Sequence, residues 1–330
     1  MAPALSPEEY HVGWICALSI EMAAAMAMLD EKHEKITGQD PQDHNSYCLG
    51  RVHDHNVVIA CLPAGVYGTT PAATVAKDML RTFKELRFGL MVGIGGGIPD
   101  LEKGIDIRLG DIVVSQPTDT NGGVIQYDRG KHEEGGLMQK GILNTPPSVL
   151  LTALNFLQAE HDLEESQVMT YLSTMFERHP RMKDTGYAFP GVEHDRLYRT
   201  TYPHPGGLDA CNQCDPAEVV ERKPRPRTTA PLIHYGVIAS GNRVIKNAAE
   251  REEIRKKYGA KSVEMEAAGL MKDFPCLVVR GVCDYADSHK NDWWQKYAAV
   301  AAAAYAKELL FYVSAEKTWH EKPIQLVAGK

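Results

Sequence analysis

The chain has 330 residues, of which 44% are hydrophobic, so it is long and apolar enough to bury one large core. Its formal net charge of −7 at pH 7 provides no basic field for a polyanion, which argues against nucleic acid and favours a small neutral or weakly charged molecule as partner. The N-terminus lacks a basic and an apolar segment, and no apolar run reaches the roughly 18 residues of a membrane span, so we expect a cytoplasmic protein that does not associate with a membrane.

Strands and helices alternate in the first part of the chain. Val12 to Leu18 is an apolar run that predicts a buried strand, after which Ser19 offers an N-cap to an alanine-rich helix from Ile20 to His33. A second helix is expected to start at Thr70, where apolar residues begin to recur at helical spacing. The further strands predicted here are Tyr47 to Val52, Val57 to Leu62, Phe88 to Val92, Ile107 to Ser115 and Val124 to Tyr127.

The segment from Lys131 to Pro231 has a different texture. Leu150 to His161 and Gln167 to Arg178 carry helical periodicity, but His179 to Pro231 is rich in Pro, Gly, His and Arg and has little periodicity. A stretch of this length without clear elements is unusual in a compact domain and is typical of a lid or a mobile excursion. We therefore interpret residues 131–231 as an insertion in a single domain that covers residues 1–330.

The alternating pattern resumes after the insertion. A strand is expected from Ile233 to Ala239, a charged helix from Ala248 to Tyr258, a strand from Leu277 to Cys283 and an alanine-rich helix from Trp293 to Tyr312. The tail, residues 315–330, is expected to be loosely attached. Strands that alternate with helices in this way predict a layered α/β fold.

The seven cysteines are too sparse for a disulfide scaffold. Cys211 and Cys214 form a CxxC pair on a polar loop, and with His204 nearby they could hold zinc. No second such pair exists, so a free or loosely paired loop is the better interpretation, and we expect neither a metal nor a cofactor. The cysteines that lie inside apolar, strand-like runs read as core residues: Cys16, Cys61, Cys276 and Cys283.

Four acidic residues stand close to the ends of predicted strands, where open α/β sheets place their ligands. They are Glu21, Glu264, Glu266 and Asp284, and each has apolar neighbours in the sequence. A carboxylate in apolar surroundings is costly unless it is paired or its pKa is raised, and a raised pKa suits a general acid or base. These residues are therefore the candidates for chemistry.

Each candidate also has a structural interpretation. Glu21 fits a first-turn glutamate that the helix dipole stabilises, and Asp284 fits a helix cap. Glu264 and Glu266 are harder to place on a solvated helix face, because they lie two residues apart in an apolar stretch. The glycine run 93–97 is not a dinucleotide-binding fingerprint, because Ile98 occupies the third glycine position; it offers bare backbone to a ligand or makes a tight turn.

Taken together, several segments resemble one family, the purine nucleoside phosphorylase and methylthioadenosine/S-adenosylhomocysteine nucleosidase superfamily, and in particular its fungal branch. The similarity covers roughly Val12 to Tyr127 and Ile233 to Tyr312. It implies a layered α/β/α sandwich with a central mixed twisted sheet and a long, partly helical insertion. It also implies a homo-oligomer, most often a dimer. The segments occur in the family's order: Ala17-Leu18-Ser19-Ile20-Glu21, Gly93-Ile94-Gly95-Gly96-Gly97, Gly110-Asp111-Ile112-Val113-Val114-Ser115, Ser240-Gly241-Asn242, Ser262-Val263-Glu264-Met265-Glu266-Ala267-Ala268 and Arg280-Gly281-Val282-Cys283-Asp284.

The resemblance implies a role for each carboxylate. Glu266 accepts hydrogen bonds from the ribose 2′ and 3′ hydroxyls while Met265 packs beneath the sugar, Asp284 protonates N7 of the purine, and Glu21 is the general base for the attacking water. This division suits an oxocarbenium-like state at C1′, which needs an acid, a base with water, and negative charge nearby. The other residues expected against the substrate are Glu264, Gly95, Gly96, Ser240, Asn242, Val244 and Ile245.

The nucleophile is expected to be water. Family members that use phosphate carry an arginine and a serine where this chain has Met91 and Ile94, and the charge of Glu21 would repel a phosphate dianion. Ile94 also departs from the hydrolytic members, where a small hydroxyl residue is common. We therefore expect a purine ribonucleoside hydrolase that acts on nucleosides such as adenosine, inosine or guanosine.

Other functions remain open at this point. They are a phosphate-dependent phosphorylase, a methylthioadenosine/S-adenosylhomocysteine nucleosidase, a non-enzymatic nucleoside sensor, and an interaction module that docks a partner through the loop His179 to Pro231. The intact set of Glu21, Glu266 and Asp284 argues against a pure sensor, because a binder has no use for a base and an acid together.

Overall fold

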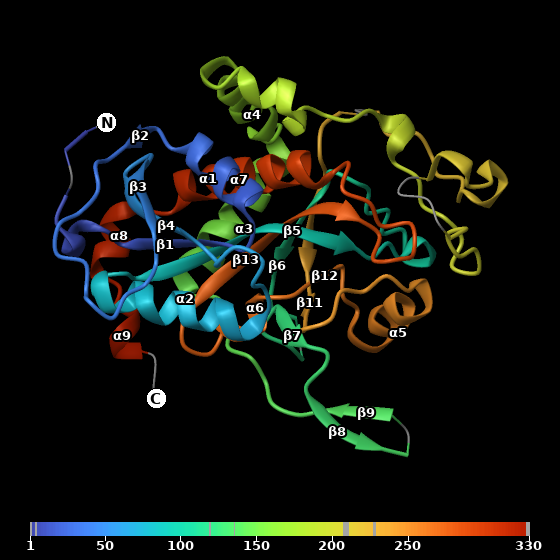
Figure 1. Ribbon diagram of the computed structural model, residues 1–330, viewed down its shortest axis with the longest axis horizontal. Coiled ribbons are helices and arrows are strands. Elements are labelled where there is room, and N and C mark those ends of the chain that lie inside the picture. The colour runs from blue at the N-terminus through green and yellow to red at the C-terminus, as the bar shows by residue number, and fades with distance from the viewer. Residues whose placement is uncertain are drawn as a thin grey trace.

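The computed structural model describes residues 2–3, 5–118, 120–134, 136–206, 211–226 and 229–327. Within these ranges, eleven strands form one mixed sheet. They are β1 (Val12–Cys16), β2 (Glu31–Lys32), β3 (Tyr47–Val52), β4 (His55–Cys61), β5 (Phe88–Gly97), β6 (Ile112–Ser115), β7 (Val124–Gln126), β10 (Ile233–Gly236), β11 (Ile238–Ser240), β12 (Ser262–Glu264) and β13 (Cys276–Asp284). The main strand order is β10-β6-β13-β5-β1-β4-β3-β2, and β12, β11 and β7 join through the end of β5 (Figure 1).

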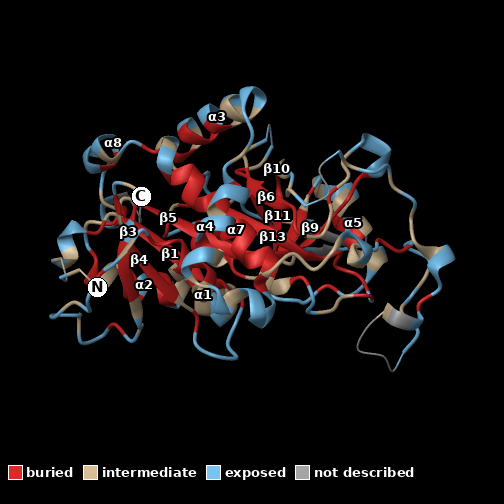
Figure 2. Cartoon of the chain, turned by 90° about the horizontal axis from the view of Figure 1, so that it is seen from above, coloured by how far each residue is buried: buried red, intermediate tan, exposed pale blue. Residues whose placement is uncertain are grey.

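Helices cover both faces of this sheet. On one face lie α1 (Ser19–Met28), α3 (Ser148–Leu163), α4 (Val168–Arg178) and α7 (Gln295–Tyr312), with α7 in contact with the other three and with β5 and β13. On the other face lie α2 (Thr69–Thr82) and α6 (Ala267–Leu270), while α5 (Ala248–Tyr258) packs beside β11 and β12. The buried residues concentrate along the sheet and α7 (Figure 2). The predicted layered α/β/α fold with a mixed sheet is confirmed.

The central strands are apolar on both faces because both faces are covered. In β1, Trp14 and Cys16 join the cluster under α7, whereas Ile15 joins the cluster under α2, and all five residues of the strand are buried. Parallel pairing of β1 with β4 and β5 needs such two-sided burial, which explains the continuous apolar run in the sequence.

Several predicted boundaries are wrong. β6 begins at Ile112 rather than Ile107, after a turn in which Gly110 has a φ of 87°, and the predicted strand Ile233 to Ala239 divides into β10 and β11 after Gly236.

Two other differences arise from distant segments. The glycine run does not follow a strand that ends at Val92, since β5 continues to Gly97 and pairs with β13 along its length. The first helix ends at Met28 rather than His33, because Glu31 and Lys32 leave it to pair antiparallel with β3. In both places tertiary contacts override the local pattern.

Residues 131–231 divide into three parts. The hairpin of β8 (Gly130–Glu133) and β9 (Gly136–Gln139) stands away from the sheet (Figure 1). Helices α3 and α4 bury Leu154, Leu157 and Leu172 against the core under α7. The remainder contains short single turns and reaches the loop after β13. The assignment of this segment as an insertion stays a prediction.

The C-terminal segment carries α8 (Ala315–His320) and α9 (Ile324–Val327). Ile324 is buried and its amide donates to the Leu86 carbonyl at 2.8 Å. Over the described ranges, no single helix is long and apolar enough to cross a membrane. α7 and the segment Ala315–Leu326 reach the required length and apolar character only together, and the two are bent by 82° relative to each other.

Candidate active site

A cavity of about 260 Å³ opens where β1, β12 and β13 end beside the glycines of β5. Most of the site residues that the sequence predicts line this cavity. β5 lies between β1 and β13, so these two strands are two strand spacings apart, roughly 10 Å. The sequence-predicted residues that line it are Glu21, Gly95, Gly96, Val244, Ile245, Glu264, Met265, Glu266 and Asp284.

Two predicted residues, Ser240 and Asn242, lie outside this lining. The Ser240 hydroxyl accepts the amide of Ala268 at 2.9 Å and thereby holds α6 against β11. The Asn242 side-chain oxygen accepts the backbone amide and the hydroxyl of Thr69, at 3.0 and 2.9 Å. Both residues position the walls of the cavity rather than face it.

Glu21 lies in the first turn of α1, directly after β1. Its carboxylate accepts three backbone amides, from Ala17 at 2.6 Å, Leu18 at 2.9 Å and Ile94 at 2.8 Å. Burial raises the pKa of Glu21, while the charge of Arg280 and the amide hydrogen bonds oppose that rise. Glu21 therefore caps its own helix, and it also presents a buried carboxylate of raised pKa to the cavity; its catalytic role stays a prediction.

Arg280 is the central cation of the site, and no pattern in the sequence predicts a role for it. It is fully buried on β13; its guanidinium contacts the carboxylate of Glu264 and lies 3.4 Å from that of Glu266. Glu21 and Arg280 both lie against Gly93 of β5. A Cβ added at this glycine would lie 2.3 Å from a Glu21 oxygen and 2.6 Å from an Arg280 nitrogen, so a larger residue would clash with both side chains. A lone arginine in the apolar run Leu277 to Cys283 was the signal that could have found it.

Glu264 serves the scaffold of the site. One of its oxygens is bound by Arg280 and also accepts the amides of Glu266 and Ala267, at 3.1 and 3.0 Å. It thereby neutralises the buried arginine and caps the short helix α6. Although Glu264 lines the cavity, these bonds leave it less free for a substrate than Glu266.

Glu266 is the carboxylate with fewest partners. It accepts the amide of Gly68 at 3.3 Å and shares Arg280 with Glu264. The pKa of Glu266 is raised to about 7, mainly by burial. The positive charge of Arg280 lowers this pKa, whereas the negative charges of Glu264 and Glu21 raise it. An acceptor with so few protein partners is suited to the hydroxyls of a ligand.

Glu266→Gln should change how stability depends on pH. The folded protein holds the Glu266 proton up to a pKa of about 7, whereas an unfolded chain releases it near 4.5, so this residue makes stability fall as the pH rises between those values. The variant lacks that contribution. Urea unfolding at about pH 5 and pH 8 should therefore show a smaller loss of stability in the variant than in the wild type, and equal losses would contradict the assigned ionisation.

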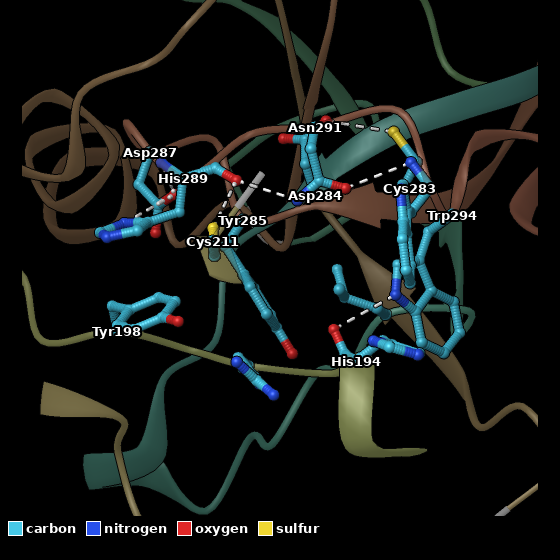
Figure 3. Close-up of a pocket in the computed structure, with 13 residues that line it drawn as sticks. His194, Tyr198, Cys211, Cys283, Asp284, Tyr285, Asp287, His289, Asn291 and Trp294 are labelled. Atoms are coloured by element: carbon cyan, nitrogen blue, oxygen red, sulfur yellow. Dashed lines mark hydrogen bonds and ion pairs between the residues drawn. The ribbon is translucent and has the colours of Figure 1, made fainter. Parts of the chain in front are cut away.

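Asp284 ends β13 and forms an ion pair that the sequence did not predict. Its carboxylate accepts hydrogen bonds from the Lys290 ammonium at 2.6 Å and from the amide of Ala286 at 2.8 Å (Figure 3 shows Asp284). Lys290 lies in the loop between β13 and α7. Burial lowers the pKa of Lys290, but the negative charge of Asp284 beside it has the larger effect, and the lysine pKa lies above its ordinary value. The helix-cap interpretation is wrong, because α7 begins only at Gln295.

A family model described as the phosphorylase superfamily matches residues 11–310. A nucleotide-binding leucine-rich repeat (NLR)-like protein of Hyaloscypha variabilis is 50% identical over 312 residues, which are 94% of this chain and 30% of that protein. The chain thus spans about a third of the length of this curated relative. The match supports the fungal branch of the resemblance.

Two further relatives have nucleosidase names. A 5′-methylthioadenosine/S-adenosylhomocysteine nucleosidase of Mycobacterium bovis is 24% identical over 91% of this chain and 95% of its own. The ATP nucleosidase Cap17 of Escherichia coli is 35% identical over 85 residues, 24% of this chain and 17% of its own. Among solved structures, futalosine hydrolase of Helicobacter pylori matches with a TM-score of 0.56 at 15% identity, over 92% of this chain and 98% of its own, and shows the same fold.

Proposed function

The chain belongs to the phosphorylase superfamily, and from this premise we propose that it is a purine nucleoside N-ribosidase that transfers the ribosyl group to water. The observation that carries the choice of water is the position of Glu21. Its carboxylate already holds the amides of Ala17, Leu18 and Ile94, the donors that an anionic nucleophile would need. A phosphate dianion entering there would meet a buried carboxylate of the same sign.

The proposed reaction begins on the ribose side. Glu266 accepts hydrogen bonds from the ribose hydroxyls, and Met265 packs beneath the sugar. As the bond from C1′ to N9 breaks, Glu21 takes a proton from water and the water oxygen bonds to C1′. The buried carboxylates Glu21 and Glu266 place negative charge beside the developing oxocarbenium ion. The products are free ribose and the purine base.

The leaving group needs a proton at N7, and the ion pair of Lys290 and Asp284 supplies it. In the resting site Asp284 accepts a hydrogen bond from the lysine ammonium, so it is not a free carboxylic acid. We assign Lys290 as the proton reservoir: its proton passes to Asp284 as Asp284 protonates N7. The proton taken up by Glu21 then returns to solvent, and Lys290 takes a proton from solvent. Each group thereby regains its starting charge, and one water molecule is consumed per turnover.

Lys290→Met should lower kcat by roughly 10²-fold, the lower end of the range for a displaced proton donor. KM should change little, because Lys290 donates its hydrogen bond to Asp284 and not to the sugar in the proposed mechanism. Steady-state kinetics with adenosine across about pH 5 to 9 would check this. The exposed Lys77→Met is the matched control, and a kcat for Lys290→Met within twofold of that control would contradict the role.

Nucleotides are a second candidate substrate class. Arg243 and Lys290 bring two cations to the lining of the cavity, and one short relative is named an ATP nucleosidase. Arg243 is paired with Glu250 at 2.6 Å, but its side chain is 62% exposed, and an exposed pair of this kind is easily exchanged for a phosphate. A plain nucleoside remains the first choice because Lys290 is committed to Asp284.

A substrate panel separates these proposals. The full chain is incubated in phosphate-free buffer with adenosine, inosine, guanosine, methylthioadenosine and ATP, and the released base is quantified by chromatography. If base is released from adenosine, inosine or guanosine with the highest kcat/KM, the proposed N-ribosidase is supported. If methylthioadenosine or ATP is preferred, the proposed substrate is wrong but hydrolysis of the N-glycosidic bond is still the reaction. Absence of base release from all five, with binding retained, would favour a nucleoside sensor. The cytoplasmic location and the homo-oligomer stay predictions.

A further inference from the structure

A thiol and imidazole cluster lies outside the proposed active site. The ligand atoms of His204, Cys211 and Cys214 all lie within 4.8 Å of one another. The single turn Cys211–Gln213 brings the two thiols of the CxxC pair together, and His204 approaches from the preceding part of the same loop. Cys214 is buried and the other two are half-buried, so the cluster is not a solvated surface group.

A buried histidine of the loop after β13 borders this cluster. His289 stacks on Tyr198 with ring centroids 4.0 Å apart, and its ring centroid lies 5.3 Å from that of His204 (Figure 3 shows the stack). The Cys211 thiol lies 3.7 Å from the His289 carbonyl oxygen. Among the described residues, the Nε2 atom of His289 has no hydrogen-bond partner, although the side chain is buried. A buried imidazole nitrogen without a partner is costly and points to a bound group.

We propose that His204, Cys211 and Cys214 bind a zinc ion, with His289 or a water molecule at the fourth corner of the tetrahedron. Two thiolates and an imidazole are the ligands that zinc prefers, and in a zinc tetrahedron such atoms lie roughly 3.5 Å apart, so a small closing movement forms the site. Binding releases the two thiol protons, and the two thiolate charges balance that of the ion. The sequence alone favoured a free loop because only one CxxC pair was visible.

The zinc ion would fasten residues 195–206 and 211–222 to the loop of residues 285–291, which follows Asp284 and contains Lys290. Other contacts already join these segments: His204 donates its amide to the Ser288 hydroxyl at 2.9 Å, and Arg222 donates to the Tyr285 hydroxyl at 2.8 Å. Ala286 in the second loop has a φ of 52°, a left-handed conformation that a residue with a Cβ adopts only when its surroundings hold it. The metal site therefore has a structural role that does not depend on the proposed reaction.

Metal content tests the proposal directly. The full chain is purified under reducing conditions, equilibrated with zinc sulfate, passed through a desalting column and measured by mass spectrometry for elements. We expect about one zinc ion per chain, and less than a tenth of that in the double variant C211S/C214S. The matched control is Cys48→Ala, which removes a buried thiol of β3 and should keep the zinc. Equal zinc in the double variant and the wild type, or none in the wild type, would overturn the site.

A second measurement covers the case in which the double variant fails to fold. Zinc should protect two thiols of the wild-type chain from alkylation, and peptide mapping should identify them as Cys211 and Cys214. A chelator should expose both and lower the melting temperature. A Cys211–Cys214 disulfide in the reduced, zinc-equilibrated protein, or alkylation of both thiols at the same rate with and without zinc, would contradict zinc binding. Neither readout needs catalysis, so the metal site can fail while the proposed function stands.

Discussion

Glu21→Gln should lower hydrolytic turnover by roughly 10² to 10⁴-fold while purine binding stays close to that of the wild type. The amide cannot take the proton of the attacking water, and it also removes a negative charge from the side of the cavity where the oxocarbenium ion develops. Val244 and Ile245, which line the cavity and which the family resemblance places against the substrate, are on a different segment and are not altered. Single-turnover kinetics with adenosine and calorimetric binding of adenine measure the two effects separately.

Two controls make this experiment decisive. Glutamine presents an amide nitrogen to the backbone N–H groups of Ala17, Leu18 or Ile94, so some stability is lost, and the melting temperature must show that the variant is folded at the assay temperature. Glu31→Gln, on the edge strand β2, is the matched neutral substitution and should retain full activity. Turnover of Glu21→Gln equal to that of Glu31→Gln at saturating substrate would remove Glu21 from the mechanism.

Arg280→Met should cause the largest loss of stability, about 3 to 5 kcal/mol at neutral pH, because it leaves buried carboxylates without their counter-charge. Glu264, Glu266 and Glu21 all interact with this guanidinium, and each is almost completely buried. The loss should be smaller at about pH 5.5 than at pH 8. Burial already raises the pKa values of Glu21 and Glu266, and Arg280 opposes that rise. Without the cation both pKa values rise further, so protonation at the lower pH removes part of the repulsion.

Urea unfolding at both pH values measures this effect. The matched control is Arg51→Met, which removes an exposed arginine paired with Glu31 at 3.0 Å and should cost no more than about 1 kcal/mol. A loss for Arg280→Met as small as that of the control, or one that does not depend on pH, would show that the buried carboxylates do not rely on this cation.

Local patterns in the sequence were sufficient for most of the fold. The apolar runs of β1 and β13 and the periodic helices α2, α5 and α7 were placed within a few residues, because two-sided burial and a helical face leave a direct trace in the sequence. Errors arose where a distant segment decided the outcome. The pairing of Glu31 and Lys32 with β3 ended α1 early, and the partners on both sides of β5 kept its glycines extended.

The site residues also divide into those that a local sequence pattern predicts and those that only the folded chain reveals. Glu21, Glu266 and Asp284 stood out because carboxylates in apolar runs are rare, and the structure brings all three to one cavity. Their partners could not be read from spacing, since Arg280 reaches Ile94 across 186 positions of the sequence. The hydrogen bond of Lys290 to Asp284 spans only six residues, but it lies in a loop without periodicity, so no pattern marked it. His204 and the CxxC pair were noted, but only the fold shows how close they lie.

If water, not phosphate, receives the ribosyl group, the sugar product is free ribose, and the identity of that product decides between the two nucleophiles. The full chain is incubated with adenosine in phosphate-free buffer and in buffer saturated with phosphate, and the sugars are identified by mass spectrometry. We expect free ribose at the same rate in both buffers and no ribose 1-phosphate. Ribose 1-phosphate as the product, formed only when phosphate is present, would show that the Glu21 carboxylate does not exclude the anion.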